Sequence, residues 1–354
     1  MSDSAPVEGD LPFEIFRGET HSDSEPAVIP AAPPWRTFGG GRGKRLGTTF
    51  VASEDVKSVV NAALHLRRPI LITGDPGTGK SSVAYAVQKE LGLGEVIKWP
   101  INSRSTLGDG QYQYDAISRL QDTQRLKQGD FDPTQDANPR NIGDYITLGP
   151  LGTAMITSKV GRPSVLLIDE IDKSDIDLPN DLLNVFEDGY FDIPELLRLP
   201  DGSRKEVPVF LKTEIDGSRR RTIPDGTVIC DEFPFIVITS NGERELPAAF
   251  NRRCLRLDIK LPEDNADAVD SEFRRFLMQV VQSHLDEFES ELQDVEGFVK
   301  LFRDLRSKEG RVLAIDQLLQ AVYIMRRGVA PEGEAFSALR GQLEDLLFRD
   351  LKGN

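Results

Sequence analysis

Short apolar runs alternate with amphipathic segments through the middle of this chain. From residue 54 to 66 the apolar positions recur at helical spacing, and Ser53, directly before them, is a suitable N-cap. Short apolar runs beside a Gly-rich turn or an acidic pair are instead typical of buried parallel strands. Strands are predicted at 69–73, 96–99, 165–168, 235–239 and 255–259, and further helices at 81–91 and 178–186. This alternation predicts an α/β fold, with a doubly wound parallel sheet.

Two segments interrupt the alternation. Residues 102–148 are long, polar and rich in Gly, Asp and Gln. Residues 200–230 hold two glycine-centred turns, Asp201-Gly202-Ser203 and Asp216-Gly217-Ser218, between apolar pieces, which predicts one or two β-hairpins. We expect both segments to be insertions into the sheet domain.

The two ends of the chain differ from its middle. After residue 261 the strand signals stop, and amphipathic segments at 268–288, 290–306, 312–327 and 333–351 predict a small all-α lid domain over 262–354. Residues 1–46 are acidic and rich in Pro and Gly, so we expect a disordered arm there. The α/β domain is therefore expected to span 47–261.

The segment between the first predicted strand and the following helix matches the phosphate-binding pattern G-x-x-x-x-G-K-[ST] at each fixed position. The candidate nucleotide site comprises Gly74, Asp75, Pro76, Gly77, Thr78, Gly79, Lys80, Ser81 and Ser82. Glycines let backbone N–H groups curl around phosphates, and the helix N-terminus adds partial positive charge. We expect Lys80 to reach the β- and γ-phosphates of ATP and the Ser81 hydroxyl to bind Mg²⁺.

A second acidic signal follows the predicted strand at 165–168. Asp169 and Glu170 emerge at its carboxyl end, where α/β proteins bind ligands. Asp169 is expected to hold the Mg²⁺ shell, and Glu170 to polarise a water for attack on the γ-phosphate. Asp172 and Asp175 are interpreted as charges at a helix start rather than as ligands.

With these motifs the chain resembles the AAA+ ATPases, and within them the MoxR group, with the McrB-like ATPases as relatives. The resemblance covers about residues 48–330. The residues that carry it are Gly74–Ser81, Leu166–Glu170, Thr239-Ser240-Asn241, Leu246–Arg253 and Gly310-Arg311. In the MoxR group a β-rich insert and a hairpin occupy places that match 102–148 and 200–230.

The resemblance implies roles for four further residues. Asn241 matches sensor 1, which contacts the γ-phosphate or the attacking water. An Arg after Leu-Pro-x-Ala-Phe acts in this group as an arginine finger toward a neighbouring subunit. Register favours Arg253, but this sequence has Arg at both positions, so Arg252 stays a candidate. Arg311 matches sensor 2, expected at the start of a lid helix.

Some residues in the two insertions allow two interpretations of their role. Tyr112, Tyr114, Tyr145 and Ile146 are equally candidates for substrate contact and for the core of a small hairpin. The basic run Arg219-Arg220-Arg221 is interpreted mainly as a solvated turn, and otherwise as a contact for an acidic partner or nucleic acid.

The composition of the chain disfavours several classes of protein. Lys+Arg 43 against Asp+Glu 58 gives a net charge of −15, which disfavours nucleic acid as the partner. Two cysteines and three histidines are too few for a disulfide framework or a zinc or haem site. No apolar run is long enough for a membrane span, and the acidic opening MSDSAPVEGD is unlike a secretory signal. We therefore expect a cytoplasmic protein that is not associated with a membrane.

The resemblance leads to one main functional hypothesis and two alternatives. The main one is a MoxR-type ATP hydrolase that assembles into a homo-oligomeric, hexameric ring and remodels a protein substrate. Such proteins often act with a von Willebrand factor A-type partner. The first alternative is a McrB-like nucleic-acid translocase subunit that drives a separate nuclease. The second is an ATP-gated scaffold in a defence system.

Overall fold

The computed structural model describes residues 33, 47, 49–129, 141–261, 271–285, 292–307, 311, 313–327, 341, 347 and 348. The chain divides into two compact units. We call the first, Ala52–Gly74 with Gly79–Ile259, the α/β unit. The second, Lys260–Asn354 with Met1–Val51 and Asp75–Thr78, is here called the helical unit.

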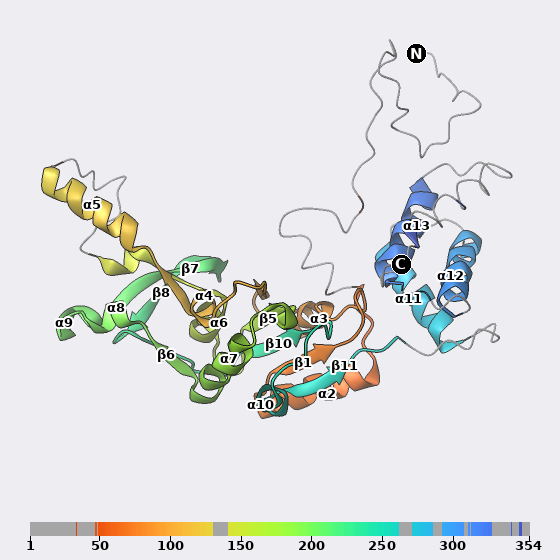
Figure 1. Ribbon diagram of the computed structural model, residues 1–354, viewed down its shortest axis with the longest axis horizontal. Coiled ribbons are helices and arrows are strands. Elements are labelled where there is room, and N and C mark those ends of the chain that lie inside the picture. Colours follow the sequence, from red (N-terminus) through yellow and green to blue (C-terminus); the bar gives the residue numbers. More distant parts are fainter. Residues whose placement is uncertain are drawn as a thin grey trace, which may run out of the picture. The chain divides into compact units, whose positions relative to one another are not determined.

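A five-stranded sheet with the order β11-β1-β10-β5-β2 forms the centre of the α/β unit (Figure 1). Its paired strands are all parallel. The strands are β1 (Ile70–Thr73), β2 (Ile97–Pro100), β5 (Val165–Asp169), β10 (Phe235–Thr239) and β11 (Leu255–Asp258). The predicted doubly wound parallel sheet is confirmed, because consecutive strands are separated by crossovers.

The parallel register brings three chain segments to one edge of this sheet. Ile72 of β1 lies opposite Thr239 of β10, and Ile238 lies opposite Ile168 of β5. The carboxyl ends of these three strands therefore meet at one edge of the sheet. Strand β1 leads into the phosphate-loop pattern, β10 ends in the Thr-Ser-Asn segment, and β5 ends in the Asp-Glu pair. Helix α2 (Glu54–Leu66), capped by Ser53 as predicted, packs along β11 and β1. Helix α3 (Ser82–Glu90) follows the loop.

The two insertions join in a second sheet, with the order β3-β4-β7-β8. Strands β3 (Tyr112–Tyr114) and β4 (Ile146–Leu148) come from the first insertion, and β7 (Glu206–Ile215) and β8 (Ser218–Pro224) from the second. A parallel pairing between β4 and β7 links them, and β7 and β8 form a hairpin. Figure 1 shows this sheet and α5 at one end of the α/β unit and β1 and β11 at the other.

One predicted hairpin turn is confirmed and one is wrong. Asp216 and Gly217 turn between β7 and β8 with positive φ angles of 50° and 72°, as a tight turn requires. Residues Asp201–Arg204, however, form the short helix α9 instead of a turn. The turn after β8 is made by Asp225 and Gly226, with φ angles of 49° and 80°.

Helix α5 (Ala116–Gln128) within the first insertion was not predicted. None of its residues is buried, and its apolar residues Ile117 and Leu120 are exposed, so it lacks the buried apolar stripe by which helices are found from sequence. Its ends are set locally, since Asp115 accepts the Ser118 N–H and Gly129 adopts a left-handed conformation. Helix α6 (Pro150–Thr157) is the opposite case, because nearly all of its residues are buried.

The remaining described elements of the α/β unit are short, apart from α7. They are α4 (Leu107–Gln111), η2 (Ile142–Tyr145), η3 (Ile171–Lys173), α7 (Asp177–Asp188), β6 (Tyr190–Asp192), α8 (Pro194–Leu197), β9 (Thr227–Ile229) and α10 (Ala248–Arg253). Strands β6 and β9 pair in a two-stranded sheet. A continuous buried core connects β2, β4, β5, β7 and β10.

The helical unit contains α11 (Glu272–Leu285), α12 (Leu292–Ser307) and α13 (Ile315–Arg327). Their apolar faces share a core in which Phe302 and Phe348 meet edge to face at 5.9 Å. Helix α13 begins at Ile315 rather than at the predicted 312. Most of the predicted arm at 1–46 and most of the predicted helix at 333–351 lie outside the described residues.

Candidate nucleotide-binding site

The phosphate-loop pattern occupies the turn between β1 and α3. Gly77 and Gly79 have φ angles of 76° and 83°, which side chains with a Cβ rarely adopt, so these positions require glycine. Lys80 is 8% exposed, and its Nζ donates to the Gly74 carbonyl at 2.7 Å. The ammonium thus bonds back to the first residue of the pattern.

Ser81 stands at the N-cap of α3 without capping it. Its Oγ donates instead to Oδ1 of Asp169 at 2.7 Å. The same Asp169 oxygen accepts from Oγ1 of Thr239 at 2.8 Å. Two hydroxyls and a carboxylate from three segments of the chain therefore converge at one point.

This donor set fits Mg²⁺, because the ion prefers hydroxyl and carboxylate oxygens. Ser81 and Asp169 are the predicted ligands, and the structure brings them together. Lys98 of β2 lies 2.6 Å from Oδ2 of Asp169. Burial alone would raise the pKa of Asp169, but the hydrogen bonds from Lys98, Ser81 and Thr239 outweigh it and hold the pKa below its ordinary value. The carboxylate is therefore ionised at neutral pH.

Glu170 is held in an uncommon conformation beside this point. Its φ and ψ of 63° and 53° lie in the left-handed region, which is rare for a residue with a side chain. Its N–H donates to Oγ1 of Thr239 at 2.9 Å. The side chain accepts from Nδ2 of Asn241 at 3.4 Å and from Nζ of Lys173 at 2.7 Å. The predicted pair of Glu170 and Asn241 is therefore brought together.

The contacts that three residues make in this site were not predicted from the sequence. Lys98 is a charged residue in the short run that predicted strand β2, which was a usable signal. The Thr239 hydroxyl serves Asp169 and Glu170 at once, and only the register of the sheet reveals this. The interpretation of Asp172 as a helix-start charge was incomplete, since its side chain is 3% exposed and accepts the N–H groups of Asn241 and Glu243.

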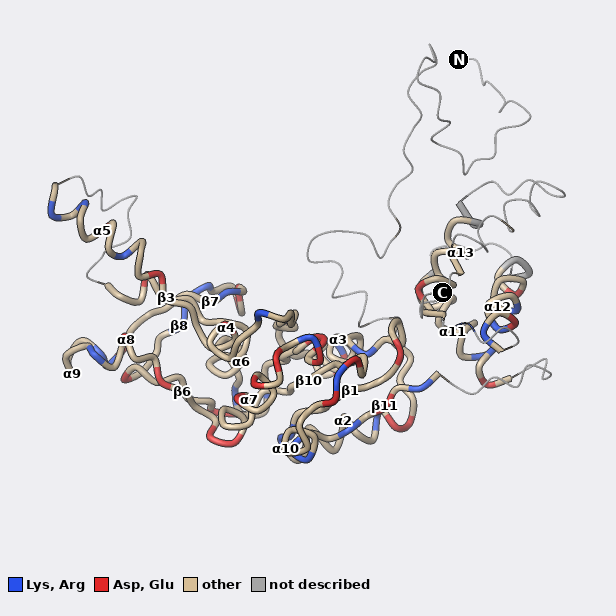
Figure 2. Tube along the Cα trace, viewed as in Figure 1, with Lys and Arg blue, Asp and Glu red and all other residues tan. Residues whose placement is uncertain are grey.

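The two candidate finger residues lie at the end of α10 (Figure 2). The Arg253 guanidinium pairs with Glu187 of α7, and Nε of Arg252 donates to the Ala248 carbonyl at 3.3 Å. Among the bonds of the described residues, none joins either arginine to Glu170 or Asn241. Arg68 fixes the backbone there by donating to the carbonyls of Arg252 and Arg253 at 2.6 and 3.1 Å.

Arg311 lies in the helical unit, before α13 rather than inside it. Its Nη1 donates to the Phe348 carbonyl at 3.1 Å. The expectation that Arg311 opens a helix is therefore wrong, and its role as sensor 2 stays a prediction.

The candidates for substrate contact in the insertions are mostly structural. Tyr145 and Ile146 are 5% and 0% exposed. The Tyr112 hydroxyl donates to Glu195 at 2.8 Å, and its ring stacks on Phe191. Arg119 donates to the Tyr114 hydroxyl at 3.0 Å. These contacts favour the interpretation that the four residues belong to the core of the inserted sheet.

The basic run is likewise engaged within the chain. Arg219 pairs with Glu214 at 3.4 Å, and Arg221 donates to the Ile215 carbonyl at 3.1 Å. Arg220 pairs with Asp144 at 2.8 Å and lies 4.0 Å over the Phe210 ring. The interpretation of this run as a solvated turn is wrong, since all three arginines lie in strand β8, and Arg220 is the one whose ion pair joins the two insertions among the described contacts.

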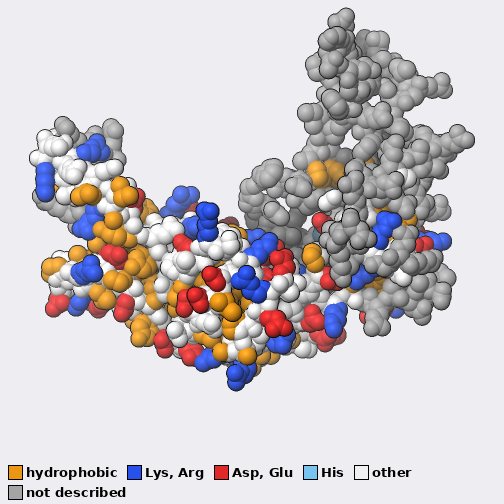
Figure 3. Space-filling model, viewed as in Figure 1, with side chains coloured by type: hydrophobic (Ala, Val, Ile, Leu, Met, Phe, Trp, Pro, Cys, Tyr) orange, Lys and Arg blue, Asp and Glu red, His pale blue; other side chains and the backbone are white. Residues whose placement is uncertain are grey.

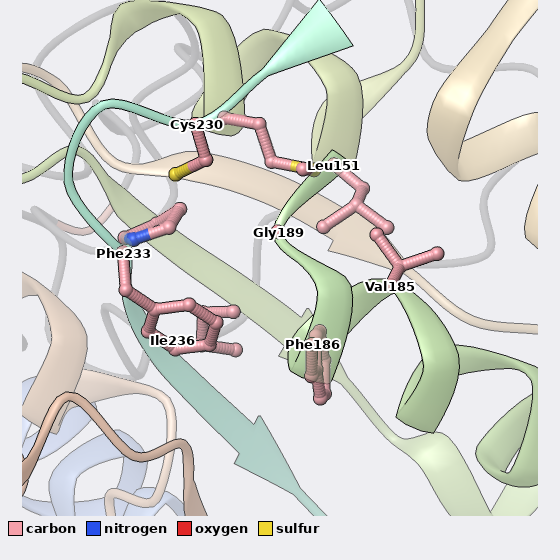
Figure 4. Close-up of a pocket in the computed structure, with 9 residues that line it drawn as sticks. Leu151, Val185, Phe186, Gly189, Cys230, Phe233 and Ile236 are labelled. Carbon is pink, nitrogen blue, oxygen red and sulfur yellow. The ribbon is translucent and has the colours of Figure 1, made fainter. Parts of the chain in front are cut away.

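A small apolar pocket lies elsewhere in the α/β unit (Figure 4). Its cavity of about 10 Å³ has room for roughly one water. Burial raises the pKa of the Cys230 thiol to about 11, so this sulfur is a poor nucleophile. The pocket lining consists of Leu151, Met155, Val185, Phe186, Gly189, Cys230, Phe233, Pro234 and Ile236.

The described residues contain no group of three or more His, Cys, Asp or Glu side chains that could hold a metal ion. Among the helices of the described chain, none combines the length and apolarity that crossing a membrane demands.

The strand–loop–helix around Lys80 and the acidic end of β5 define a P-loop nucleotide-binding domain. The model of the ATPase family associated with various cellular activities (AAA) matches residues 70–263, and the chain belongs to this family. The family implies nucleotide binding and, in general, ATP hydrolysis. Comparison with curated proteins gives no match.

Several solved structures are similar over most of the chain. One is a Cytophaga hutchinsonii protein provisionally assigned as an ATPase, 12% identical, with 87% of this chain and 83% of that chain covered and a TM-score of 0.34. Another is C. elegans PCH-2, which is 15% identical, with 86% of this chain and 67% of that chain covered and a TM-score of 0.35. A third is a DNA replication initiation factor, which is 14% identical, with 83% of this chain and 65% of that chain covered and a TM-score of 0.37. At these TM-scores the likenesses carry no argument about function.

Proposed function

We propose that this protein is a MoxR-type AAA+ ATPase that binds and hydrolyses Mg·ATP in a homo-oligomeric, hexameric ring and remodels a partner protein. The observation that carries the hydrolytic part is the convergence of Ser81, Asp169 and Thr239 beside the Glu170–Asn241 pair. The MoxR assignment and the partner follow from the resemblance of the sequence motifs.

The roles of the site residues follow from their contacts. Lys80 binds the β- and γ-phosphates, exchanging its bond to Gly74 for bonds to the nucleotide. Ser81 and Asp169 hold Mg²⁺, which when bound offsets negative charge on the phosphates. Glu170 polarises the attacking water, and Asn241 orients that water or the γ-phosphate.

A neighbouring subunit completes the site with an arginine. Arg253 or Arg252 takes this role, because both lie exposed at the end of α10, where the Arg253 side chain pairs with Glu187 and the Arg252 side chain donates to the Ala248 carbonyl. A finger supplied by another subunit is worth about 10³–10⁵ in rate. Isolated monomers therefore hydrolyse ATP slowly.

Two observations favour a protein partner over nucleic acid. The net charge is −15, which repels a phosphate backbone. On the face drawn in Figure 3, acidic and basic side chains are interspersed over the described residues. A von Willebrand factor A-type protein is the partner that the resemblance suggests.

The hydrolytic role is tested by steady-state ATP turnover of wild type against Glu170→Gln. We expect a loss of at least about 100-fold, because the water loses its base. Glu90→Gln, at the exposed end of α3, is the matched control and keeps wild-type turnover. Equal turnover in wild type and Glu170→Gln would rule out Glu170 as the base, whereas a wild type without measurable turnover would support an ATP-gated scaffold.

The ring is tested by mixing subunits. A mixture of Glu170→Gln and Arg253→Ala chains should hydrolyse ATP faster than either alone, since one supplies the finger and the other the base. Repeating the mixture with Arg252→Ala identifies the finger. Lack of rescue with both arginine variants argues against a finger acting between subunits.

The choice of partner is tested separately by adding nucleic acid. Stimulation of turnover by single- or double-stranded DNA or by RNA, by more than about tenfold, would replace the remodelling proposal with the McrB-like alternative.

A further inference from the structure

A buried carboxylate ties the end of β10 to the segment after Glu170. Oδ2 of Asp172 accepts the N–H of Asn241 at 2.9 Å and the N–H of Glu243 at 3.0 Å. Between them, the Gly242 N–H donates to Oγ of Ser240 at 3.1 Å. The backbone donors of this turn therefore have partners, and Asp172 supplies two of the bonds. Hydrogen bonds to an ionised acceptor are about twice as strong as neutral ones.

A second contact anchors the same loop further along. Nη1 of Arg244 donates to the Ser174 carbonyl at 2.8 Å. We call Asp172 and Arg244, with their partners, the loop clamp. It binds residues 241–244 to residues 172–174, which begin two positions after Glu170.

The loop clamp is in direct contact with the catalytic pair. The backbone N–H of Asn241 is bound by Asp172, and its side-chain amide is bound by Glu170 at 3.4 Å. The reach of an Asn side chain is short, so the position of its backbone decides where its amide can lie. A shift of about 1 Å is enough to cost a catalytic contact.

One detail argues against a purely stabilising role for Asp172. Its other oxygen, Oδ1, is buried and has no hydrogen-bond partner in the described part of the chain. A half-satisfied buried carboxylate is a poor choice for stability alone, because the unmatched oxygen loses its hydration. A buried polar atom without a partner calls for an explanation, and a role in catalysis is one of them.

We propose that Asp172 is a positioning residue for ATP hydrolysis, which holds the backbone of Asn241 so that its amide lies against Glu170, with Arg244 as the second anchor. This inference rests on the proposed function. Asp172, the third acid of the Asp-Glu-Ile-Asp segment, then has a positioning role that differs from metal binding and from water activation.

The test is a double-mutant cycle of Asp172→Ala with Asn241→Ala, read out by steady-state turnover. Each single variant should lower kcat about tenfold while KM for ATP changes less than about threefold. The double variant should be no slower than Asn241→Ala, because both act through one amide. Effects that multiply would overturn the proposal, as would wild-type kcat in Asp172→Ala.

A conservative variant keeps the test valid if Asp172→Ala does not fold. Asp172→Asn retains an acceptor oxygen for both N–H groups, so its kcat should fall only about two- to fivefold. In the Asn241→Ala background it should have no effect at all. Asp175→Ala is the control, since Asp175 is exposed and lies outside the clamp.

Nucleotide affinities separate failure of this inference from failure of the proposed function. Asn241→Ala and Asp172→Ala should each reduce the preference for a slowly hydrolysed ATP analogue over ADP by the same factor, about three- to tenfold. This measurement needs no turnover. If wild type does not hydrolyse ATP but the two variants still match, the hydrolytic function fails, while the placement of Asn241 by Asp172 is supported. If Asp172→Ala keeps the wild-type preference while Asn241→Ala loses it, the positioning role is wrong.

Discussion

The Thr239 hydroxyl joins the two acids at the end of β5. It donates to Asp169 at 2.8 Å and accepts the Glu170 N–H at 2.9 Å, with Thr239 itself 1% exposed. A single buried hydroxyl therefore orients a metal-binding carboxylate and stabilises the left-handed backbone of the proposed base.

Thr239→Val tests this relationship, because valine matches the shape of threonine and lacks the hydroxyl. We expect kcat to fall at least about tenfold, equivalent to about 1.4 kcal/mol in the barrier. The physical reason is that the Glu170 N–H and an Asp169 oxygen lose a partner in a buried site. Thr239→Ser, which keeps the hydroxyl, should stay within about threefold of wild type. A fully active Thr239→Val would contradict the assignment.

Lys80→Ala should remove most of the affinity for nucleotide. The charge-assisted bonds that Lys80 makes to phosphate correspond to roughly 10- to 100-fold in Kd. Equilibrium binding of a fluorescent ATP analogue measures the change. Lys89→Ala, which changes an exposed lysine in the last turn of α3, the helix after Lys80, is the control and should bind normally. Similar affinities for the two variants would remove Lys80 from the site.

The acid sensitivity of folding should depend on Asp169. Its pKa in the folded chain is below the ordinary value, so its ionised form contributes stability at pH above about 4. That contribution is lost as the pH falls through the lowered pKa. Asp169→Asn should therefore show a flatter decline of unfolding free energy between about pH 5 and 2. Denaturant titrations across this range measure it, and identical pH profiles would contradict it.

Arg220 should contribute to stability and its neighbour Arg219 should not. Arg220→Ala loses the ion pair with Asp144 and the stacking on Phe210, together about 1 kcal/mol of unfolding free energy. Arg219→Ala, whose side chain is 75% exposed, should change it by less than about 0.5 kcal/mol. Chemical denaturation measures both. Equal destabilisation would mean that Arg220 does not hold the insertions together.

Both cysteines should resist alkylation in the folded protein. Burial raises the pKa of Cys230 to about 11 and of Cys254 to about 12. At pH 8 the thiolate fraction of Cys230 is then about one part in a thousand. Iodoacetamide labelling followed by mass spectrometry should modify either cysteine slowly until denaturant is added. Rapid labelling of Cys230 in the native protein would show that its sulfur is more accessible than this burial allows.

The sequence by itself determined the central sheet and the phosphate loop. Buried parallel strands read as short apolar runs, and the Gly74–Ser81 pattern permits few other conformations, so local chemistry was sufficient there. It also predicted Asp169 and Glu170 from the end of a strand, and Asn241 from the resemblance to sensor 1, but it did not show that Ser81 and Asp169 lie within hydrogen-bond distance.

Tertiary structure decided what depends on register or on burial between distant segments. The pairing of β4 with β7 joins two insertions that are separate in sequence, and no local pattern specifies such a pairing. Helix α5 has no buried face, so periodicity could not reveal it. Asp172 was interpreted only as a charge at a helix start, because the sequence does not report burial. Only the packing of the 241–244 loop against residues 172–174 turns that carboxylate into an acceptor for two backbone N–H groups.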